Sequence, residues 1–375
     1  MRSIKEIKNC DGKKVLIRAD FNVPVSEGKV SDDFRIKKFI PTLDYLLTRG
    51  ARIILMSHTE AGEGSLQEVR EYLSHTYKVS FIDSYYPKTP KLDFNSGGIV
   101  LLENLRKYHG EKENSDEFSK HLASFVDFYV NEAFSVCHRN HASIVGVPKY
   151  IPSFAGLNLL EEISHLSKAF SPEHPFLFIL GGAKAETKLP LIKKFYDIAD
   201  RIFIGGALVN DFLRAKGYPV GHSLVSETRL DFSSFLTEKL ILPDEVCVER
   251  NGRCIDKPAD EISDHEYVVD VGIESVRALR SVINNSRFIL WNGPLGNYEQ
   301  GHKGATHVLA NLIGESTAHS IVGGGDTVAS IAELGIFEKF SFVSTGGGAM
   351  LDFLTSETLP GIEALNGSAS QTNLG

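Results

Sequence analysis

Apolar and polar positions alternate along VLIRADFNVPV, residues 15–25, in the pattern of a β-strand. One face of the predicted strand carries an apolar row made of Val15, Ile17, Ala19, Phe21 and Val23. The other face carries Arg18, Asp20 and Asn22, and the segment ends at Pro24. A guanidinium, a carboxylate and an amide spaced two apart are not the usual solvent-facing row of a strand. We therefore expect them to belong to a site.

Strand-like and helix-like segments alternate through the whole chain. Residues 34–50, FRIKKFIPTLDYLLTRG, keep apolar side chains at helical spacing, and SDEFSKHLASFV does the same. Short apolar runs recur between the helices: ARIILMSH, KVSFID, GIVLLEN, FYVNEAF, FLFILGG, RIFIGGA, RFILWNG, HSIVGGG and KFSFVSTGGG. This alternation indicates βαβ units, whose parallel sheets are covered by helices on both faces. We expect an α/β fold with two doubly wound, Rossmann-like domains.

The length of 375 residues favours two domains over a single core. GLNLLEEISHLSKAF, residues 156–170, reads as a helix between Pro152 and Pro172 and is the expected connector. We place one domain at residues 1–156, a hinge helix at 157–170 and the other domain at 171–356.

Composition and charge narrow the classes of function. Hydrophobic residues make up 42% and charged residues 23% of the chain, an ordinary globular balance. The formal net charge of −8 gives no electrostatic support for nucleic-acid binding. No apolar run reaches the roughly 18 residues of a membrane span, and MRSIKEIKNC lacks the apolar centre of a signal peptide. We expect a cytoplasmic protein with reduced thiols and no membrane partner.

Two of the four cysteines, Cys247 and Cys254, flank an Asn251-Gly252 turn. In a two-residue hairpin, Glu249 faces Cys254, and Cys247 is only a diagonal neighbour. The sequence therefore does not imply a disulfide.

Five strand-like runs of the second half end in glycine-containing turns. These turns are LGGAK at 180–184, IGGAL at 204–208, WNGPLG at 291–296, VGGGDT at 322–327 and TGGGAM at 345–350. A single such glycine signifies only a tight turn, but ligands of open α/β sheets lie beyond the carboxyl ends of the strands. Glycine also lets backbone N–H groups approach a phosphate. We expect a phosphate or nucleotide crevice at these turns.

Two familiar nucleotide motifs are absent from the sequence. No G-x-G-x-x-G opens a helix after a strand, which disfavours a dinucleotide dehydrogenase. GNYEQGHKGAT approaches a P-loop, but His302 stands where the lysine is required, so this match is rejected.

Charged residues beside the glycine turns are candidates for phosphate and metal binding. Lys184 and Lys188 lie four residues apart at an expected helix start, where the helix dipole disfavours cations. Solvated lysines are the simpler interpretation, but a polyphosphate partner explains both. Asp326 follows three glycines and suits either an N-cap or a carboxylate that binds Mg²⁺ on nucleotide phosphates.

The first half carries a set of cationic candidates at or just beyond strand ends: Arg18, Arg35, His58, Arg106 and Arg139, of which Arg35 opens a helix. Each alone suits a surface ion pair or a cap. Together they indicate a site for phosphate and carboxylate groups, because arginine binds both in bidentate geometry. The run Cys137-His138-Arg139-Asn140-His141 could suggest zinc, but the arginine in its middle favours an anion.

The blocks IRADFNVPV, VLLENLRKYHGE, VNEAFSVCHRNHAS, ILGGAKAETKL, ILWNGPLGNYE, VGGGDTVASI and STGGGAMLDFL resemble successive motifs of the phosphoglycerate kinases, in the same order. The resemblance covers nearly the whole chain. It implies a glycolytic hinge enzyme that transfers phosphate reversibly between 1,3-bisphosphoglycerate and MgADP, giving 3-phosphoglycerate and MgATP. It also implies that the N-terminal domain binds the glycerate, that the C-terminal domain binds the nucleotide, and that residues 357–375 return to the N-terminal domain.

The resemblance also implies roles for individual residues. On the glycerate side, Asp20 and Asn22 hold the hydroxyl and carboxylate end, with Arg18 lining the same basic face. His58, Arg106 and Arg139 clamp the distant phosphate, and Arg35 lies nearest the reacting carboxyl group. The implied nucleotide side consists of Lys188 on a phosphate, Lys184 on the phosphoryl group in transfer, Glu299 on the ribose, and Gly324, Gly325, Asp326 and Thr327 on phosphates and Mg²⁺.

No general base is required by this chemistry, because the acceptor is a carboxylate that is already ionised at neutral pH. The protein has to position the groups, neutralise charge and exclude water. The resemblance further implies a monomer that binds neither nucleic acid nor a membrane.

One block departs from the family pattern. The family reads SHLGRP where this chain reads SHTEAG, so Ala61 replaces an arginine that follows His58. We expect weaker binding of the glycerate phosphate as a result. Without the resemblance, the residues alone leave three classes open: a phosphotransferase, a nicotinamide dehydrogenase and a non-catalytic anion-binding protein.

Overall fold

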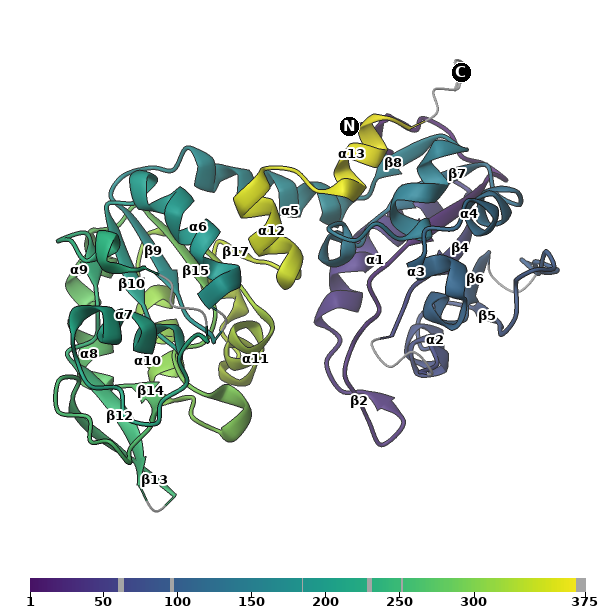
Figure 1. Cartoon of the computed structure of the whole chain (residues 1–375). Helices are drawn as coiled ribbons and strands as arrows, with labels where there is room; N and C mark the ends of the chain where they lie inside the picture. Colours follow the sequence, from purple (N-terminus) through teal and green to yellow (C-terminus); the bar gives the residue numbers. More distant parts are fainter. Residues whose placement is uncertain (60–63, 95–97, 184, 228–230, 251, 369–375) are drawn as a thin grey trace. The chain divides into compact units, whose positions relative to one another are not determined.

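The computed structural model describes residues 1–59, 64–94, 98–183, 185–227, 231–250 and 252–368 (Figure 1). The chain divides into two compact units, one formed by Met1–Ser164 with Ser356–Gly375 and the other by His165–Thr355. Each unit contains a six-stranded sheet whose neighbouring strands are all parallel. The prediction of an α/β fold with two parallel sheets is confirmed.

The first unit has the strand order β5-β6-β4-β1-β7-β8. Its sheet strands are β1 (Lys14–Arg18), β4 (Arg52–Met56), β5 (Val79–Ile82), β6 (Ile99–Leu102), β7 (Phe128–Asn131) and β8 (Ser153–Ala155). Its helices are α1 (Phe34–Leu47), α2 (Gln67–Ser74), α3 (His109–Lys112), α4 (Asp116–Ala123) and α13 (Pro360–Asn366), and β2 (Val25–Ser26) pairs with β3 (Lys29–Val30). The chain leaves β1 toward β4 on one side and later returns to β7 on the other, so the order reverses beside β1.

The core of the first unit contains the apolar row predicted from the sequence. Val15, Ile17, Ala19 and Phe21 are buried in it, and Val23 packs against it. The strand itself is shorter than predicted, because backbone pairing in register with β4 and β7 stops at Arg18. Asp20 and Asn22 therefore lie beyond the end of β1, where ligands of open α/β sheets bind.

The second unit repeats the scheme with the strand order β11-β10-β9-β15-β16-β17. The strands are β9 (Phe176–Leu180), β10 (Arg201–Ile204), β11 (Leu240–Ile241), β15 (Phe288–Asn292), β16 (His319–Gly323) and β17 (Phe342–Val343). The helices are α6 (Ala185–Ile198), α7 (Leu208–Lys216), α8 (Ile273–Ala278), α9 (Arg280–Asn285), α10 (Gly304–Gly314), α11 (Gly325–Leu334) and α12 (Gly348–Ser356). Here the order reverses between β9 and β15. All five strands predicted to end in glycine turns belong to this one sheet.

A smaller antiparallel sheet, β13-β12-β14, was not foreseen beyond its turn. It consists of β12 (Glu245–Arg250), β13 (Arg253–Pro258) and β14 (Val268–Val271). Glu249 faces Cys254, as predicted for a two-residue hairpin. The expectation of reduced thiols is wrong for one pair that the sequence did not imply, since the structure joins Cys247 to Cys254, with their Cα atoms 5.5 Å apart. The two cysteines are diagonal neighbours in this register, and diagonal side chains on one face of a sheet lie within reach of one another.

The predicted connector is helical, as α5 (Leu157–Ser167) followed by a 3₁₀ turn at Lys168–Phe170. Its first turn is anchored by Glu132, which follows β7. The Glu132 carboxyl group accepts hydrogen bonds from Asn158 N at 2.9 Å and from the Thr42 hydroxyl at 2.6 Å. Burial raises the pKa of Glu132 to about 8. The side chain that follows β7 thus satisfies N–H groups that the helix start leaves unpaired.

The C-terminal segment belongs to the first unit. Gly361 N, in α13, donates a 2.8 Å hydrogen bond to Cys137 O, and Arg2 donates to the Ser368 hydroxyl at 2.9 Å. Over the residues that the structure describes, no helix has the length and apolar character needed to cross a bilayer.

Candidate active site

Polar side chains gather beyond the carboxyl ends of the first sheet. Asp20 follows β1, His58 follows β4, Arg106 follows β6 and Arg139 follows β7, while Arg35 lies in the first turn of α1. Because parallel strands end at one edge of the sheet, the topology brings these segments to a common rim beside the point of strand-order reversal.

Arg35 is held at this rim by two acceptors from the segment after β1. Its Nη1 atom forms a 2.9 Å ion pair with Asp20 Oδ2 and donates to Asn22 O at 3.1 Å. Ser135 also donates to Asp20 Oδ2, at 2.5 Å. Burial alone would raise the pKa of Asp20, but the Arg35 charge and the Ser135 hydrogen bond lower it below its usual value. Asp20 therefore stays ionised and fixes the Arg35 guanidinium, whose side chain remains 29% exposed.

Arg18 has a different position from the one expected. Its side chain is buried and donates to Ser143 Oγ at 2.9 Å, to Ala19 O at 2.6 Å and to His58 Nδ1 at 3.2 Å. Glu111, also buried, accepts from the same Ser143 hydroxyl at 2.6 Å. Arg18 therefore supports the rim from inside the protein and does not line its exposed face.

His58 was expected to act as a cation, and the structure corrects this. Burial and then the Arg18 charge lower its pKa to about 2, so the ring is neutral. A guanidinium has no acceptor, so Nδ1 must accept the Arg18 hydrogen bond and the ring proton lies on Nε2. His58 can then donate from Nε2 to an oxygen of a ligand without adding charge.

Arg106, Arg139 and His141 form the remaining side of the rim. Burial, together with the charges of Arg18, Arg106 and Arg139, lowers the pKa of His141 to about 4. The structure therefore brings these arginines within electrostatic reach of His141, and Arg139 is exposed. Sequence reasoning considered His141 only as a zinc ligand. The sequence signal that could have placed His141 at the rim is its position two residues after Arg139, on the same loop.

The glycine turns of the second sheet pack closely at its point of strand-order reversal. Gly181 N donates to Asn292 O at 2.8 Å, and Gly182 N donates to Pro294 O at 2.9 Å. A Cβ atom on Gly181 would overlap the backbone of Gly293 and Pro294. Glycine is therefore required where the turns after β9 and β15 meet.

Lys188 lies beside these turns, in the first half of α6. Its side chain is buried, and its Nζ donates a 2.7 Å hydrogen bond to Asn292 Oδ1, a neutral acceptor. Burial lowers the pKa of Lys188 to about 8. Within the described ranges, no carboxylate forms an ion pair with it, which leaves the site in need of an anion. Lys184, the other expected lysine, lies outside the described residues, as does Ala61.

The turn from β16 into α11 was expected to handle phosphates and metal. Gly324 caps the helix with φ at +105°, a conformation that favours glycine, and Gly325 begins it. Thr327 Oγ1 is buried and has no hydrogen-bond partner in the part of the chain that the structure describes. An orphaned hydroxyl at a helix N-terminus fits an absent phosphate or metal-bound oxygen.

Asp326 follows on the first turn of α11 and is exposed. Burial of part of its carboxyl group raises its pKa, and the charge of Glu299 raises it further. Glu299 lies in the 3₁₀ turn Tyr298–Gln300 and is exposed. The Asp326 carboxylate, next in sequence to the orphaned Thr327 hydroxyl, is a hard oxygen donor, which fits Mg²⁺.

Two Rossmann-like sheets, one with a rim of arginines and the other with glycine turns beside a buried lysine, are typical of an α/β protein that binds phosphorylated ligands. The family model described as phosphoglycerate kinase matches residues 4–357. The chain therefore belongs to the phosphoglycerate kinase family, whose acceptor is 3-phosphoglycerate.

Individual relatives are similar to this chain over almost its full length. The phosphoglycerate kinase of Rubrobacter xylanophilus is 39% identical, with 97% of this chain and 98% of the relative covered. The cytosolic phosphoglycerate kinase of Nicotiana tabacum is 37% identical with the same coverage. The structure of phosphoglycerate kinase from Coxiella burnetii aligns with a TM-score of 0.82 at 34% identity, covering 97% of this chain and 98% of that one.

Proposed function

We propose that this chain catalyses reversible phosphoryl transfer from 1,3-bisphosphoglycerate to MgADP, without a general base. The first unit (residues 1–156 with the 357–375 return) would bind the glycerate, and residues 171–356 would bind the nucleotide. Residues 157–170 would serve as the hinge over which the units close. The acceptor carboxylate carries no proton at neutral pH, so the enzyme has to position charges and exclude water.

On the glycerate side, the proposal assigns Arg35 to the reacting carboxyl group. The Asp20 ion pair supports this role, because it holds the guanidinium in one orientation while part of it stays exposed. Asp20 and Asn22 would bind the hydroxyl and carboxylate end. Neutral His58 would donate its Nε2–H to the distant phosphate, to which Arg106 and Arg139 would supply the positive charge.

On the nucleotide side, Lys188 would bind a phosphate of ATP or ADP, and Lys184 the phosphoryl group in transfer. Gly324, Gly325 and Thr327 would donate backbone and hydroxyl hydrogen bonds to phosphate oxygens, and Glu299 would accept from the ribose. Asp326 would hold Mg²⁺, which when bound supplies neutralisation of the phosphate charge.

One observation carries this proposal. Lys188 is a buried cation whose only described polar partner is the neutral side chain of Asn292. Such a charge is costly to bury unless a ligand supplies the counter-charge. The glycine turns beside it leave no side chain in the way, which suits a polyphosphate.

The test is a coupled assay with 3-phosphoglycerate and MgATP. Turnover that needs both substrates is the expected result, and its absence in folded protein would refute the proposal. Thermal stabilisation by MgADP but not by NAD separates it from the dehydrogenase alternative. A non-catalytic anion-binding protein would bind the substrates without turnover. Size-exclusion chromatography with light scattering tests the further proposal of a monomer.

A further inference from the structure

One face of the β12–β13 hairpin concentrates groups that bind metals. Cys247 pairs with Asp256 and Glu249 with Cys254 in the antiparallel register. Since side chains alternate along a strand, these four residues project from the same face. The hairpin's two arginines, at positions 250 and 253, pair with one another and belong to the opposite face. Neither strand supplies a cation to the face that carries the thiols and carboxylates.

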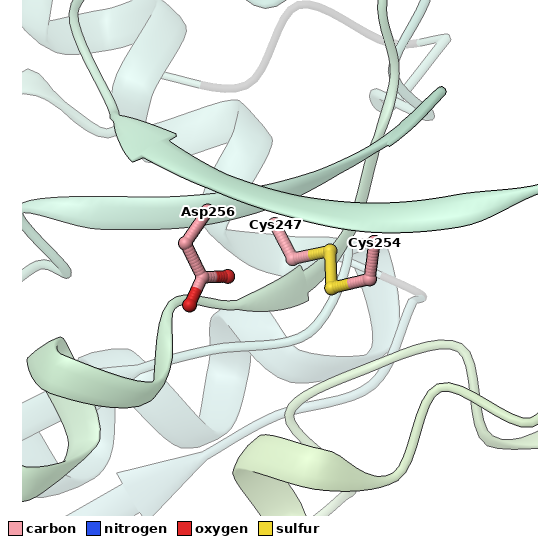
Figure 2. A group of neighbouring side chains, drawn as sticks. All are labelled: Cys247, Cys254 and Asp256. Atoms are coloured by element: carbon pink, nitrogen blue, oxygen red, sulfur yellow. A yellow bond between two sulfur atoms is a disulfide. The ribbon is translucent and has the colours of Figure 1, made fainter. Parts of the chain in front are cut away.

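Three ligand atoms of this face lie close enough to share one ion. One atom each from Cys247, Cys254 and Asp256 lies within 4.8 Å of the others, and Figure 2 shows the three side chains gathered on one side of the hairpin. Across the described ranges, this is the one group of three or more such residues with that spacing. Cys247 is buried, whereas Cys254 and Asp256 are exposed, so an ion could enter from solvent.

A second observation is a buried carboxyl group on the next strand. Asp270 of β14 pairs with Cys247 and is 5% exposed. Its carboxyl group accepts hydrogen bonds from Val271 N at 2.9 Å and from Ala305 N at 3.2 Å. No basic side chain of the described residues forms an ion pair with it. Asp270 therefore adds a carboxyl group without a basic partner to this side of the sheet, whereas Glu249 Oε2 lies 3.4 Å from His302 Nε2.

We propose that Cys247, Cys254 and Asp256 form a redox-gated site for one thiophilic divalent cation of the zinc class. The structure holds the two cysteines as a disulfide. A dithiol reductant converts this disulfide to two thiols, and the reductant itself becomes a disulfide. The cation then displaces the two thiol protons and bonds to both thiolates and to one Asp256 oxygen.

The donor set suits that class of ion. Zinc binds thiolates at about 2.3 Å and carboxylate oxygens at about 2.0–2.2 Å, and thiolates favour it over magnesium and calcium. A tetrahedral ion leaves one position for water or for Glu249, which lies opposite Cys254. Oxidation removes both sulfur ligands at once, so the disulfide and the bound cation exclude one another. A reducing compartment would favour the metal-bound form.

Titration of the full-length protein with Co²⁺ tests the proposal, because thiolate–cobalt bonds give a charge-transfer band in the near ultraviolet. After reduction and removal of the reductant, we expect one equivalent of Co²⁺ to produce this band and Zn²⁺ to abolish it. The oxidised protein should give no band. Any Co²⁺ bound at Asp326 in the proposed nucleotide site has oxygen ligands and gives no such band, so the two sites are distinguished.

Single substitutions test which residues bind the cation. Cys254→Ser, at an exposed position, should lose the band, and Asp256→Asn should weaken Co²⁺ binding at least roughly tenfold. Cys10→Ala and Asp264→Asn are the matched controls and should bind as the wild type does, with circular dichroism confirming that each variant is folded. The proposal is overturned if the reduced protein shows no band, if Cys254→Ser keeps it, or if Asp256→Asn binds with unchanged affinity.

Discussion

Lys188 Nζ donates a 2.7 Å hydrogen bond to Asn292 Oδ1, linking α6 to the end of β15 at the reversal point of the second sheet. The contact holds a buried ammonium group beside the glycine turns without cancelling its charge. It thereby keeps the charge available for an anion, and it makes the proposed nucleotide site sensitive to pH.

Binding of MgADP should weaken as the pH rises above about 8, because burial lowers the pKa of Lys188 to about that value. A bound phosphate raises this pKa again, so binding at pH 8.5 should take up protons from the buffer. Isothermal titration calorimetry in two buffers of different ionisation enthalpy measures the uptake. Lys188→Met should bind more weakly and lose the proton uptake. Equal uptake by the variant would rule out Lys188 as the titrating group.

Removing Arg35 should act on turnover, since its guanidinium is fixed by Asp20 and is proposed to neutralise charge at the reacting carboxyl group. We expect Arg35→Ala to lower kcat roughly 10²- to 10³-fold. Lys37→Ala is the matched control, because Lys37 lies on the same helix, is 68% exposed and forms a surface ion pair with Asp33. The measurement is kcat from steady-state kinetics in the coupled assay. A wild-type kcat in Arg35→Ala would show that Arg35 does not neutralise charge at the reacting carboxyl group.

The pH dependence of the free energy of unfolding should reveal the titration of Glu132, whose pKa is raised by burial from 4.5 to about 8. The folded state keeps this proton where the unfolded state loses it, so the stabilisation is complete below pH 4.5 and is lost as the pH rises to about 8. Glu132→Gln should therefore lose less stability than the wild type between pH 5 and pH 8, by a difference on the order of a few kcal/mol.

Urea denaturation at the two pH values measures the Glu132 effect. The control is Glu71→Gln, which changes an exposed carboxylate of α2 in the same unit. It should follow the wild-type curve. If the free energy of unfolding changes by the same amount between the two pH values in Glu132→Gln and in the wild type, Glu132 does not titrate in this range.

Installing the missing arginine should strengthen substrate binding. Ala61→Arg is expected to lower KM for 3-phosphoglycerate by up to about tenfold, because a charged hydrogen bond to phosphate is added. Ala61→Gln, long but uncharged, should change KM little. An unchanged KM in the arginine variant would mean that position 61 does not reach the phosphate or that another cation already fills that role.

The sequence by itself determined the class of fold and which residues are candidates for the site. Apolar runs alternating with amphipathic helices define two parallel sheets, and short-range periodicity carries that information because each element buries its own face. The glycine turns and the cationic residues could be found because they follow strands directly. The motif order was enough to identify the family.

Only the tertiary structure decided what the individual charges do. Burial beneath the rim turns Arg18 into an internal support and makes His58 neutral, although both look like surface cations in the sequence. Glu132 and Asn292 were missed because their partners, Asn158 and Lys188, lie 26 and 104 residues away along the chain. The Cys247–Cys254 bond joins two strands across the β12–β13 hairpin. Desolvation and long-range pairing are properties of the folded chain, and no local pattern records them.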